Sequence, residues 1–304
     1  NKGISIIYIS HKLNEIFDLC DMVTVMRDGH VIDTKPITEM THEEMITKMV
    51  GRSIEKEYPE RPRCVGETLL EVRNLNTRKL HDINFKVNRG EILGFVGLVG
   101  AGRTEIIRAI YGADKVKGHE LFIEGQHKKI KNPIDAISAG IALIPEDRKL
   151  QGLILSQSVK TNIVMAIQKK HTKFGFLNKS SEKAIAEKQV ASLLIKTPSI
   201  KTRVVSLSGG NQQKCVVGRW LETQSKILIM DEPTRGIDVG AKYEIYMLMK
   251  EIVEKGASII LISSELPEVL NMSNRVLAIC EGRISGEFNP ETTSVNAIME
   301  KVLG

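Results

Sequence analysis

Short apolar runs and helical apolar spacing follow one another along most of the chain, which indicates alternating strands and helices. Runs rich in β-branched residues predict strands at 69–75, 82–87, 91–97, 121–125, 141–146, 226–231 and 258–263. Helices are predicted at 103–112, 241–256 and 265–270, and helical spacing dominates from about 150 to 206, where 180–196 is amphipathic. The alternation predicts an α/β fold with a largely parallel core sheet, and the helical stretch falls between two halves of that sheet.

The two ends of the sequence repeat one pattern without a gap. Gly3–Gly51 aligns with Gly256–Gly304, so that "GISIIYISHKLNEIF" matches "GASIILISSELPEVL" and "MITKMVG" matches "IMEKVLG". Self-similarity of this length indicates a duplicated domain. We therefore interpret 1–51 as the C-terminal tail of a first domain, whose opening "GISIIYIS" predicts a buried strand. On that interpretation, roughly two hundred further residues precede it in the full-length protein.

A connector joins this tail to the second domain. Residues 52–67, "RSIEKEYPERPRCVGE", are charged, contain Pro59 and Pro62, and show no hydrophobic period. Such a composition predicts an exposed linker. The second copy of the domain then occupies 68–304 in full.

Composition narrows the function only moderately. The chain has 304 residues, 42% of them hydrophobic, and a net charge of +6 that is spread along its length. An even spread favours a solvated surface over a nucleic-acid patch. Cys20, Cys64, Cys215 and Cys280 lack paired spacing, which indicates free thiols and neither zinc nor disulfides. No apolar run is long enough to span a membrane, so any membrane role must come through a partner.

A glycine-rich loop carries the first chemical signal. "GLVGAGRTE" places Gly97, Gly100 and Gly102 between a predicted strand and a predicted helix, which is the setting of a phosphate-binding loop. Thr104 can offer its hydroxyl to Mg²⁺, but Arg103 stands where that loop normally has lysine. Taken alone, the loop is also compatible with a tight strand-to-helix turn that binds nothing.

A buried strand that ends in two acids supports the nucleotide site. "KILIMDEPTRGID" delivers Asp231 and Glu232 to the end of the strand, as a Walker B motif does. Asp231 would lie on the Mg²⁺ side of bound phosphates, and Glu232 would orient or deprotonate an attacking water. A strand-end acidic pair that merely caps the next element is the simpler alternative.

"SLSGGNQQK" at 206–214 completes a set of three motifs. It resembles the signature motif of ATP-binding cassette (ABC) ATPases, with Ser208, Gly209 and Gly210 opening a helix. The resemblance implies a P-loop NTPase of ABC type, with an antiparallel β subdomain, an inserted α-helical subdomain, and ATP and Mg²⁺ as cofactors. It also implies that the signature contacts ATP held by an opposite domain, and that Asp238 in "RGID" communicates across the pair.

Some positions depart from the family pattern around one nucleotide. Ser264 stands where the family has a switch histidine, and "PEDRK" at 145–149 replaces the expected Q-loop glutamine. No aromatic residue stands out to stack on adenine, because Phe85 falls in a core strand. By contrast, His11 occupies the switch position of the first copy.

The resemblance implies head-to-tail pairing with the missing first nucleotide-binding domain and two composite sites. One would use His11 and the signature Ser208–Gly210, and the other would use the Arg103 loop with Asp231 and Glu232. The first keeps its switch histidine and an intact signature, so it is expected to hydrolyse ATP efficiently. The second is expected to bind nucleotide through Arg103, which can pair with phosphate, but to turn over poorly.

The whole chain resembles the ATPase subunit of bacterial monosaccharide importers of the ribose/galactose/methyl galactoside branch. "MVGRSI", "LVGAGRTE", "GRWLETQ" and "DEPTRGIDVGAKYEIY" carry that resemblance. It implies integral membrane sugar permease subunits, a periplasmic or lipid-anchored sugar-binding protein, and a peripheral position on the cytoplasmic face of the membrane. The alternatives are a tandem cassette that acts outside transport, or, for this chain alone, an ATP-binding regulatory half with little hydrolysis.

Overall fold

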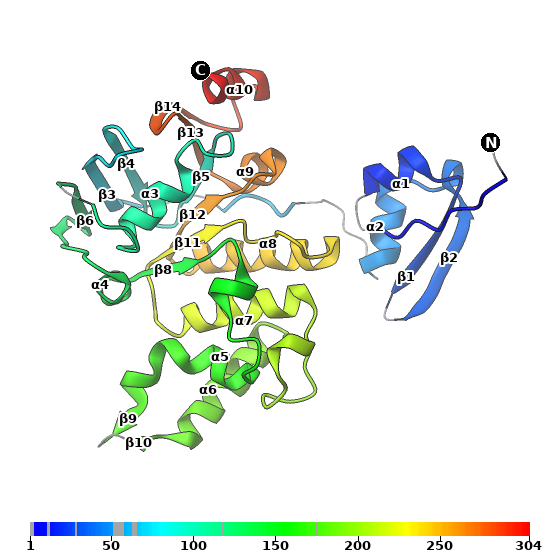
Figure 1. Ribbon diagram of the computed structural model, residues 1–304, viewed down its shortest axis with the longest axis horizontal. Coiled ribbons are helices and arrows are strands. Elements are labelled where there is room, and N and C mark those ends of the chain that lie inside the picture. Colours follow the sequence, from blue (N-terminus) through cyan, green and yellow to red (C-terminus); the bar gives the residue numbers. More distant parts are fainter. Residues whose placement is uncertain are drawn as a thin grey trace.

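The computed structural model describes residues 3–10, 13–27, 29–50, 58–62, 66–116, 118–173 and 176–304. Its main body is built on a six-stranded sheet in the order β14-β13-β5-β12-β11-β8 (Figure 1). The strands are β5 (Ile92–Val96), β8 (Ile141–Ile144), β11 (Ile227–Asp231), β12 (Ser258–Ile262), β13 (Arg275–Cys280) and β14 (Arg283–Phe288). All neighbours pair in parallel except β14, which is antiparallel to β13. The parallel strands therefore end together at one edge, where the site lies.

A four-stranded antiparallel sheet packs beside the parallel one. Its order is β4-β3-β6-β7, with β3 (Thr68–Leu75), β4 (Ile83–Asn88), β6 (Glu120–Ile123) and β7 (Gln126–His127). Phe85 of β4 meets Phe95 of β5 edge-on, with ring centroids 5.4 Å apart. The contact joins the two sheets in one core and confirms that Phe85 is a core residue.

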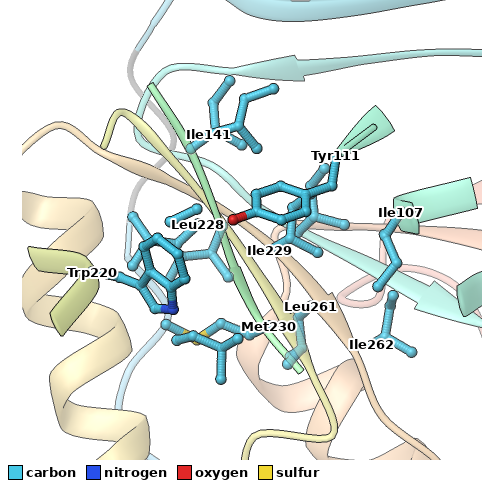
Figure 2. Close-up of a cluster of buried hydrophobic side chains, with 14 of the residues drawn as sticks. Ile107, Tyr111, Ile141, Trp220, Leu228, Ile229, Met230, Leu261 and Ile262 are labelled. Carbon is cyan, nitrogen blue, oxygen red and sulfur yellow. The ribbon is translucent and has the colours of Figure 1, made fainter. Parts of the chain in front are cut away.

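Helices cover the parallel sheet because its strands are apolar on both faces. They are α3 (Arg103–Ile110), α4 (Pro133–Ser138), α8 (Val239–Glu254), α9 (Leu266–Met272) and α10 (Val295–Leu303). Figure 2 shows Tyr111 and Trp220 among the side chains of β11, including Leu228 and Met230, and all four are buried. Within the ranges that the structure describes, no helix has both the length and the apolar character that a membrane crossing needs.

The helical insertion lies between β8 and β11, as predicted, but it is less regular than expected. It contains a π-helical turn at Arg148–Gly152, α5 (Val159–Val164), a 3-10 stretch at Met165–His171, strands β9 (Thr172–Lys173) and β10 (Phe176–Leu177), α6 (Lys179–Ser192), a 3-10 turn at Val204–Ser206 and α7 (Gly209–Leu221). The predicted amphipathic helix over 180–196 ends early. Its fully buried positions are Glu182, Ala186 and Gln189, while Ile185 and Val190 are only partly buried against the core.

The N-terminal segment forms a small core of its own. Its elements are α1 (Leu13–Leu19), β1 (Met22–Arg27), β2 (His30–Pro36), a 3-10 turn at Ile37–Glu39 and α2 (His42–Val50). They follow the same order as α9, β13, β14 and α10 at the other end of the chain. The two hairpins even share a bulge at the aligned step, between Val25 and Met26 in β1 and between Ala278 and Ile279 in β13.

The buried strand predicted at the start of this segment is wrong for this structure. Gly3–Ser10 has no strand pairing, and Ile4, Ile6, Ile7 and Ile9 are exposed. In the second copy the matching strand, β12, is buried between β5 and β11. Within the described ranges, no strand pairs with Gly3–Ser10, so its side chains stay in solvent.

The described part of the linker is also less exposed than its composition predicts. The ring of Tyr58 stacks on Tyr246 of α8, with centroids 5.1 Å apart. Arg61 donates to the backbone oxygens of Leu270 and Asn271 at the end of α9. Free backbone carbonyls at a helix C-terminus accept such donors readily, so this stretch is fastened to the main body.

Candidate nucleotide-binding site

The glycine loop between β5 and α3 has the backbone geometry that its sequence predicts. A Cβ on Gly97 would lie 2.5 Å from the backbone oxygen of Ile279, so only glycine fits there. Gly102 has a φ of 113°, in the left-handed region that favours glycine. Helix α3 begins at Arg103 directly after it. The N-terminus of a helix attracts anions, so the loop is arranged to hold phosphate.

Thr104 and Asp231 meet at the carboxyl edge of the sheet. The Thr104 hydroxyl donates to Asp231 Oδ2 over 3.3 Å, although 127 positions separate the two residues. Asp231 is only 3% exposed. The pKa of its carboxyl is raised to about 6, mainly by burial and also by the negative charge of Glu232, against the opposing effects of Thr104 and Arg103. The predicted loop and the predicted Walker B strand therefore form one site.

Glu232 is turned toward the end of β12 by an unusual backbone conformation. Its φ is 49°, and its backbone N–H donates to the Ile262 oxygen over 2.8 Å. A left-handed conformation at a non-glycine residue costs free energy and is commonly retained at functional sites. The Ser264 hydroxyl donates to Glu232 Oε2 over 3.0 Å, so the residue at the switch position contacts the candidate catalytic carboxylate. Burial raises the pKa of Glu232 as well.

Arg103 is tied to the same strand end. Its Nη1 donates to the Ser263 backbone oxygen over 3.1 Å, which links the phosphate loop to β12. The guanidinium therefore lies on the side of the site where Ser264 and Glu232 meet. Its planar fork has further N–H donors that can pair with a phosphate.

The donor set fits Mg²⁺. Magnesium prefers oxygen ligands, and Thr104 and Asp231 supply a hydroxyl and a carboxylate at one point. Burial is the main cause of the raised pKa values of Asp231 and Glu232, and a divalent cation bound at this point would favour their ionised forms. Across the part of the chain that the structure describes, no cluster of three or more His, Cys, Asp or Glu side chains offers a metal site of another kind.

The signature residues lie in another part of the fold. Ser208 caps α7 and accepts from the Asn211 amide, and Asp238 caps α8 and accepts from the Ala241 backbone N–H over 2.9 Å. Ser208, Gly210 and Asp238 line an open cleft of about 920 Å³, together with Met26 and Met49 of the N-terminal segment. Neither the glycine loop nor Asp231 and Glu232 line that cleft. The sequence-predicted residues therefore divide into two groups.

Two predicted features remain outside the described residues. His11, which is the switch position of the first copy, and Cys64 lie outside the residues that the structure describes. Cys20, Cys215 and Cys280 are free thiols, as predicted.

Arg148 has a structural role that sequence reasoning missed. Its guanidinium donates to the backbone oxygens of Arg235 and Gly236, over 2.5 Å and 2.9 Å. It also approaches Gly209, where an added Cβ would lie 2.8 Å from Nη2. The segment 145–149, which lacks the expected Q-loop glutamine, therefore connects the loop after β11 with the start of α7. Its position directly after β8, at the same sheet edge as Asp231, was the available signal.

Comparison with known proteins agrees with this geometry. The family model described as "ABC transporter" matches residues 80–235. The xylose import ATP-binding protein XylG of Moorella thermoacetica is 49% identical to the chain, and the ribose import ATP-binding protein RbsA of Oceanobacillus iheyensis is 47% identical. Each alignment covers 100% of the chain but only 62% and 61% of the relative. The chain thus spans about three fifths of the length of the curated relatives it matches.

Solved structures with the same fold are more distant in sequence. The ADP conformation of MJ1267, an ATP-binding cassette of an ABC transporter, aligns with a TM-score of 0.66 at 22% identity. The alignment covers 78% of the chain and 99% of MJ1267. A nucleotide-free ATP-binding cassette aligns with a TM-score of 0.65 over 78% of the chain and 95% of its own length, also at 22% identity. These matches confirm the predicted fold class. Because the family model covers half of the chain and the relatives align over all of it, the chain belongs to the ABC transporter family.

Proposed function

We propose that this chain is part of an ATP-binding and ATP-hydrolysing subunit that powers import of a monosaccharide through a membrane permease. The observation that carries the proposal is the meeting of Thr104 with Asp231 and Glu232 at the edge of the parallel sheet. The relatives' names supply the transport context, because both describe import ATP-binding proteins. The proposal extends to a protein longer than this chain.

Each group of residues in the site would have a separate role. The backbone of the Gly97–Gly102 loop and the start of α3 would hold the phosphates, and Arg103 would pair with them in place of lysine. Thr104 and Asp231 would hold Mg²⁺, which neutralises phosphate charge when it is bound. Glu232, anchored by Ser264, would orient or deprotonate the attacking water.

Domain organisation forms the second part of the proposal. Residues 1–51 would complete a first nucleotide-binding domain, 52–67 would link it to the second, and 68–304 would be the second. The matching order of elements and the shared hairpin bulge support this division. In a head-to-tail pair, Ser208–Gly210 and His11 would serve a first, efficient site. Asp238 would communicate between the two domains.

The site around Arg103 and Ser264 would then bind ATP and hydrolyse it slowly. Partners would be integral membrane permease subunits and, indirectly, a periplasmic or lipid-anchored sugar-binding protein. The subunit would lie at the cytoplasmic face of the membrane. Since both relatives described above carry pentose names, ribose and xylose are the first sugars to test, followed by galactose.

The test begins with nucleotide binding to the purified protein. We expect a fluorescent ATP analogue to bind in the presence of Mg²⁺, and Thr104→Ala to weaken that binding about tenfold while losing most of its Mg²⁺ dependence. Thr292→Ala, which changes an exposed threonine between β14 and α10, serves as the matched control. ATP binding that is equally strong with and without Mg²⁺ would contradict the site assignment.

Transport is tested in proteoliposomes that contain the full-length protein, its permease and its sugar-binding protein. We expect ATP-dependent uptake of one of the three labelled sugars. Absence of ATP-dependent uptake of all three would contradict the transport function while leaving the nucleotide site intact.

A further inference from the structure

Glu268 of α9 is a completely buried acid next to the nucleotide site. It is 0% exposed. Its Oε1 accepts a hydrogen bond from the Thr234 hydroxyl over 3.0 Å, and its Oε2 accepts one from the Ser263 hydroxyl over 2.5 Å. Within the described ranges, no Lys, Arg or His forms a salt bridge with it. Each oxygen of this carboxyl thus accepts a hydrogen bond from a neutral hydroxyl.

The two donors belong to the two segments that carry the site. Thr234 lies two residues after Glu232, at the turn that follows β11. Ser263 directly follows β12 and immediately precedes Ser264, whose hydroxyl donates to Glu232. The backbone oxygen of Ser263 also accepts from Arg103. Through these two hydrogen bonds, the side chain of Glu268 connects the loop after β11 with the loop after β12.

The same pair recurs in the N-terminal segment. Ser10 and Glu15 occupy the positions that align with Ser263 and Glu268, and the Ser10 hydroxyl donates to Glu15 Oε2 over 3.3 Å. This bond forms although Gly3–Ser10 is not paired into a sheet. Both copies of the repeat therefore have a hydrogen bond between the serine just before the switch position and the glutamate five positions after that serine.

We propose that Glu268 is a positioning residue, which holds Ser263 and Thr234 so that Arg103 and Glu232 face the bound nucleotide. This inference rests on the proposed function for the site itself. The side chain does not contact the nucleotide position; it acts through the two hydroxyls. Buried hydrogen-bond networks of this kind fix one arrangement, because a lost partner leaves a buried polar group unsatisfied.

Glu91 provides a comparison, because it is a buried acid next to the same sheet with a purely structural role. It is 1% exposed, lies just before β5 at the opposite end of the strands, and forms a salt bridge with Arg275. Glu268 instead forms no salt bridge among the described residues, although Lys242 acts on it electrostatically from a distance, and burial raises its pKa to about 7. A carboxyl held by two neutral hydroxyls at the active edge fits a positioning role better than a stabilising ion pair.

The experiment compares Glu268→Gln, Ser263→Ala and the double variant with Glu91→Gln as the matched control. Glutamine keeps the volume but offers one acceptor oxygen, so one hydroxyl can no longer donate to this side chain and has to accept from the amide N–H instead. We expect each single variant to weaken Mg-ATP binding about fivefold, and the double variant to be no weaker than the worse single one. Glu91→Gln is expected to lower the melting temperature and leave the affinity unchanged. Unchanged affinity in Glu268→Gln and Ser263→Ala would overturn the proposal.

Hydrogen exchange provides a readout that needs no nucleotide. We expect amides in 231–236 and 262–266 to exchange faster in Glu268→Gln and Ser263→Ala, and not in Glu91→Gln. Exchange that rises evenly over the whole domain, or not at all, would overturn the proposal. Failure of wild-type protein to bind ATP would instead refute the proposed function, and the exchange data would still decide the role of Glu268. If Glu268→Gln does not fold, Ser263→Ala decides it alone.

Discussion

The two ends of this chain carry nearly the same pattern, yet only one of them completes its fold. Ser258–Ile262 forms β12, fully buried between β5 and β11. The aligned stretch in Gly3–Ser10 forms no strand, and Ile7 is 92% exposed where Ile260 is 0% exposed. The sequence is not the cause, since six of the eight residues in "GISIIYIS" and "GASIILIS" are identical. The difference lies in the neighbouring strands.

The elements that do form in both copies need only nearby partners. The hairpins β1–β2 and β13–β14 pair within a few residues of their turns, and α1 and α9 follow directly after the aligned stretches. A parallel strand needs neighbours that are distant in sequence, because parallel pairing requires a crossover connection. β12 takes its neighbours from the main body, and Gly3–Ser10 has none within the described ranges.

The largest expected effect comes from shortening the matched isoleucines. We expect Ile260→Ala to lower the free energy of unfolding by about 3 kcal/mol, because it leaves a cavity in a packed core. Ile7→Ala in the same chain should change it by less than about 0.5 kcal/mol, since the side chain is in solvent. Urea unfolding, followed by circular dichroism and by the fluorescence of Trp220, the single tryptophan, measures both.

The longer protein proposed above would allow a direct test of this comparison. If a first domain supplies the missing neighbours, Ile7→Ala should there cost about as much as Ile260→Ala. Equal costs already in the present chain would show that Gly3–Ser10 finds a packed partner here, and the contrast between the two copies would fail.

The second comparison concerns the aligned switch positions, His11 and Ser264. In the full-length protein, His11→Ala is expected to reduce ATP-driven import about a hundredfold, equivalent to about 2.7 kcal/mol of activation free energy. Ser264→Ala should reduce import less than twofold, because the site around Arg103 is proposed to hydrolyse ATP slowly. Uptake rates in proteoliposomes measure both. Similar losses in the two variants would contradict the proposed asymmetry.

Local and regular features of the molecule could be predicted from sequence. The strand that ends in Asp231 and the glycine loop before Arg103 were recognisable because their residue types and spacing are fixed by backbone geometry and phosphate chemistry. The insertion between β8 and β11 was also recognisable. Its irregular turns were not, because short apolar runs do not distinguish helix from strand.

Contacts between distant residues account for what sequence missed. Arg148 looked like a departure from a motif, and only the fold brings it to Gly236 and Gly209. The sequence pattern did not single out Glu268, which lies in the short helix α9. The recurrence of serine and glutamate at Ser10 and Glu15 was the available signal, but burial could not be inferred from spacing. The Tyr58 stack was hidden because linker composition reports average polarity and not individual contacts.

The smallest expected effect separates the two serine–glutamate pairs by their dependence on pH. Burial raises the pKa of Glu268 from 4.5 to about 7 in the folded protein. Between these values the folded state binds more protons than the unfolded state, so this group stabilises the fold below about pH 4.5. That stabilisation is lost as the pH rises through 7. The loss between pH 5 and pH 7 amounts to about 2 kcal/mol.

Glu268→Gln removes this titration, so its free energy of unfolding should fall by about 2 kcal/mol less than that of the wild type over the same pH interval. Asp231 titrates in the same direction and remains in both proteins, which leaves a residual slope. Thr292→Ala, which removes no titratable group, is the control and should keep the wild-type slope, while Glu15→Gln measures the contribution of the aligned position in the N-terminal segment. Urea unfolding at pH 5, 6 and 7 measures these slopes. A wild-type slope in Glu268→Gln would mean that the folded protein holds this carboxyl ionised. The contrast between the two copies would then be limited to the strand that forms in the second copy and not in the first.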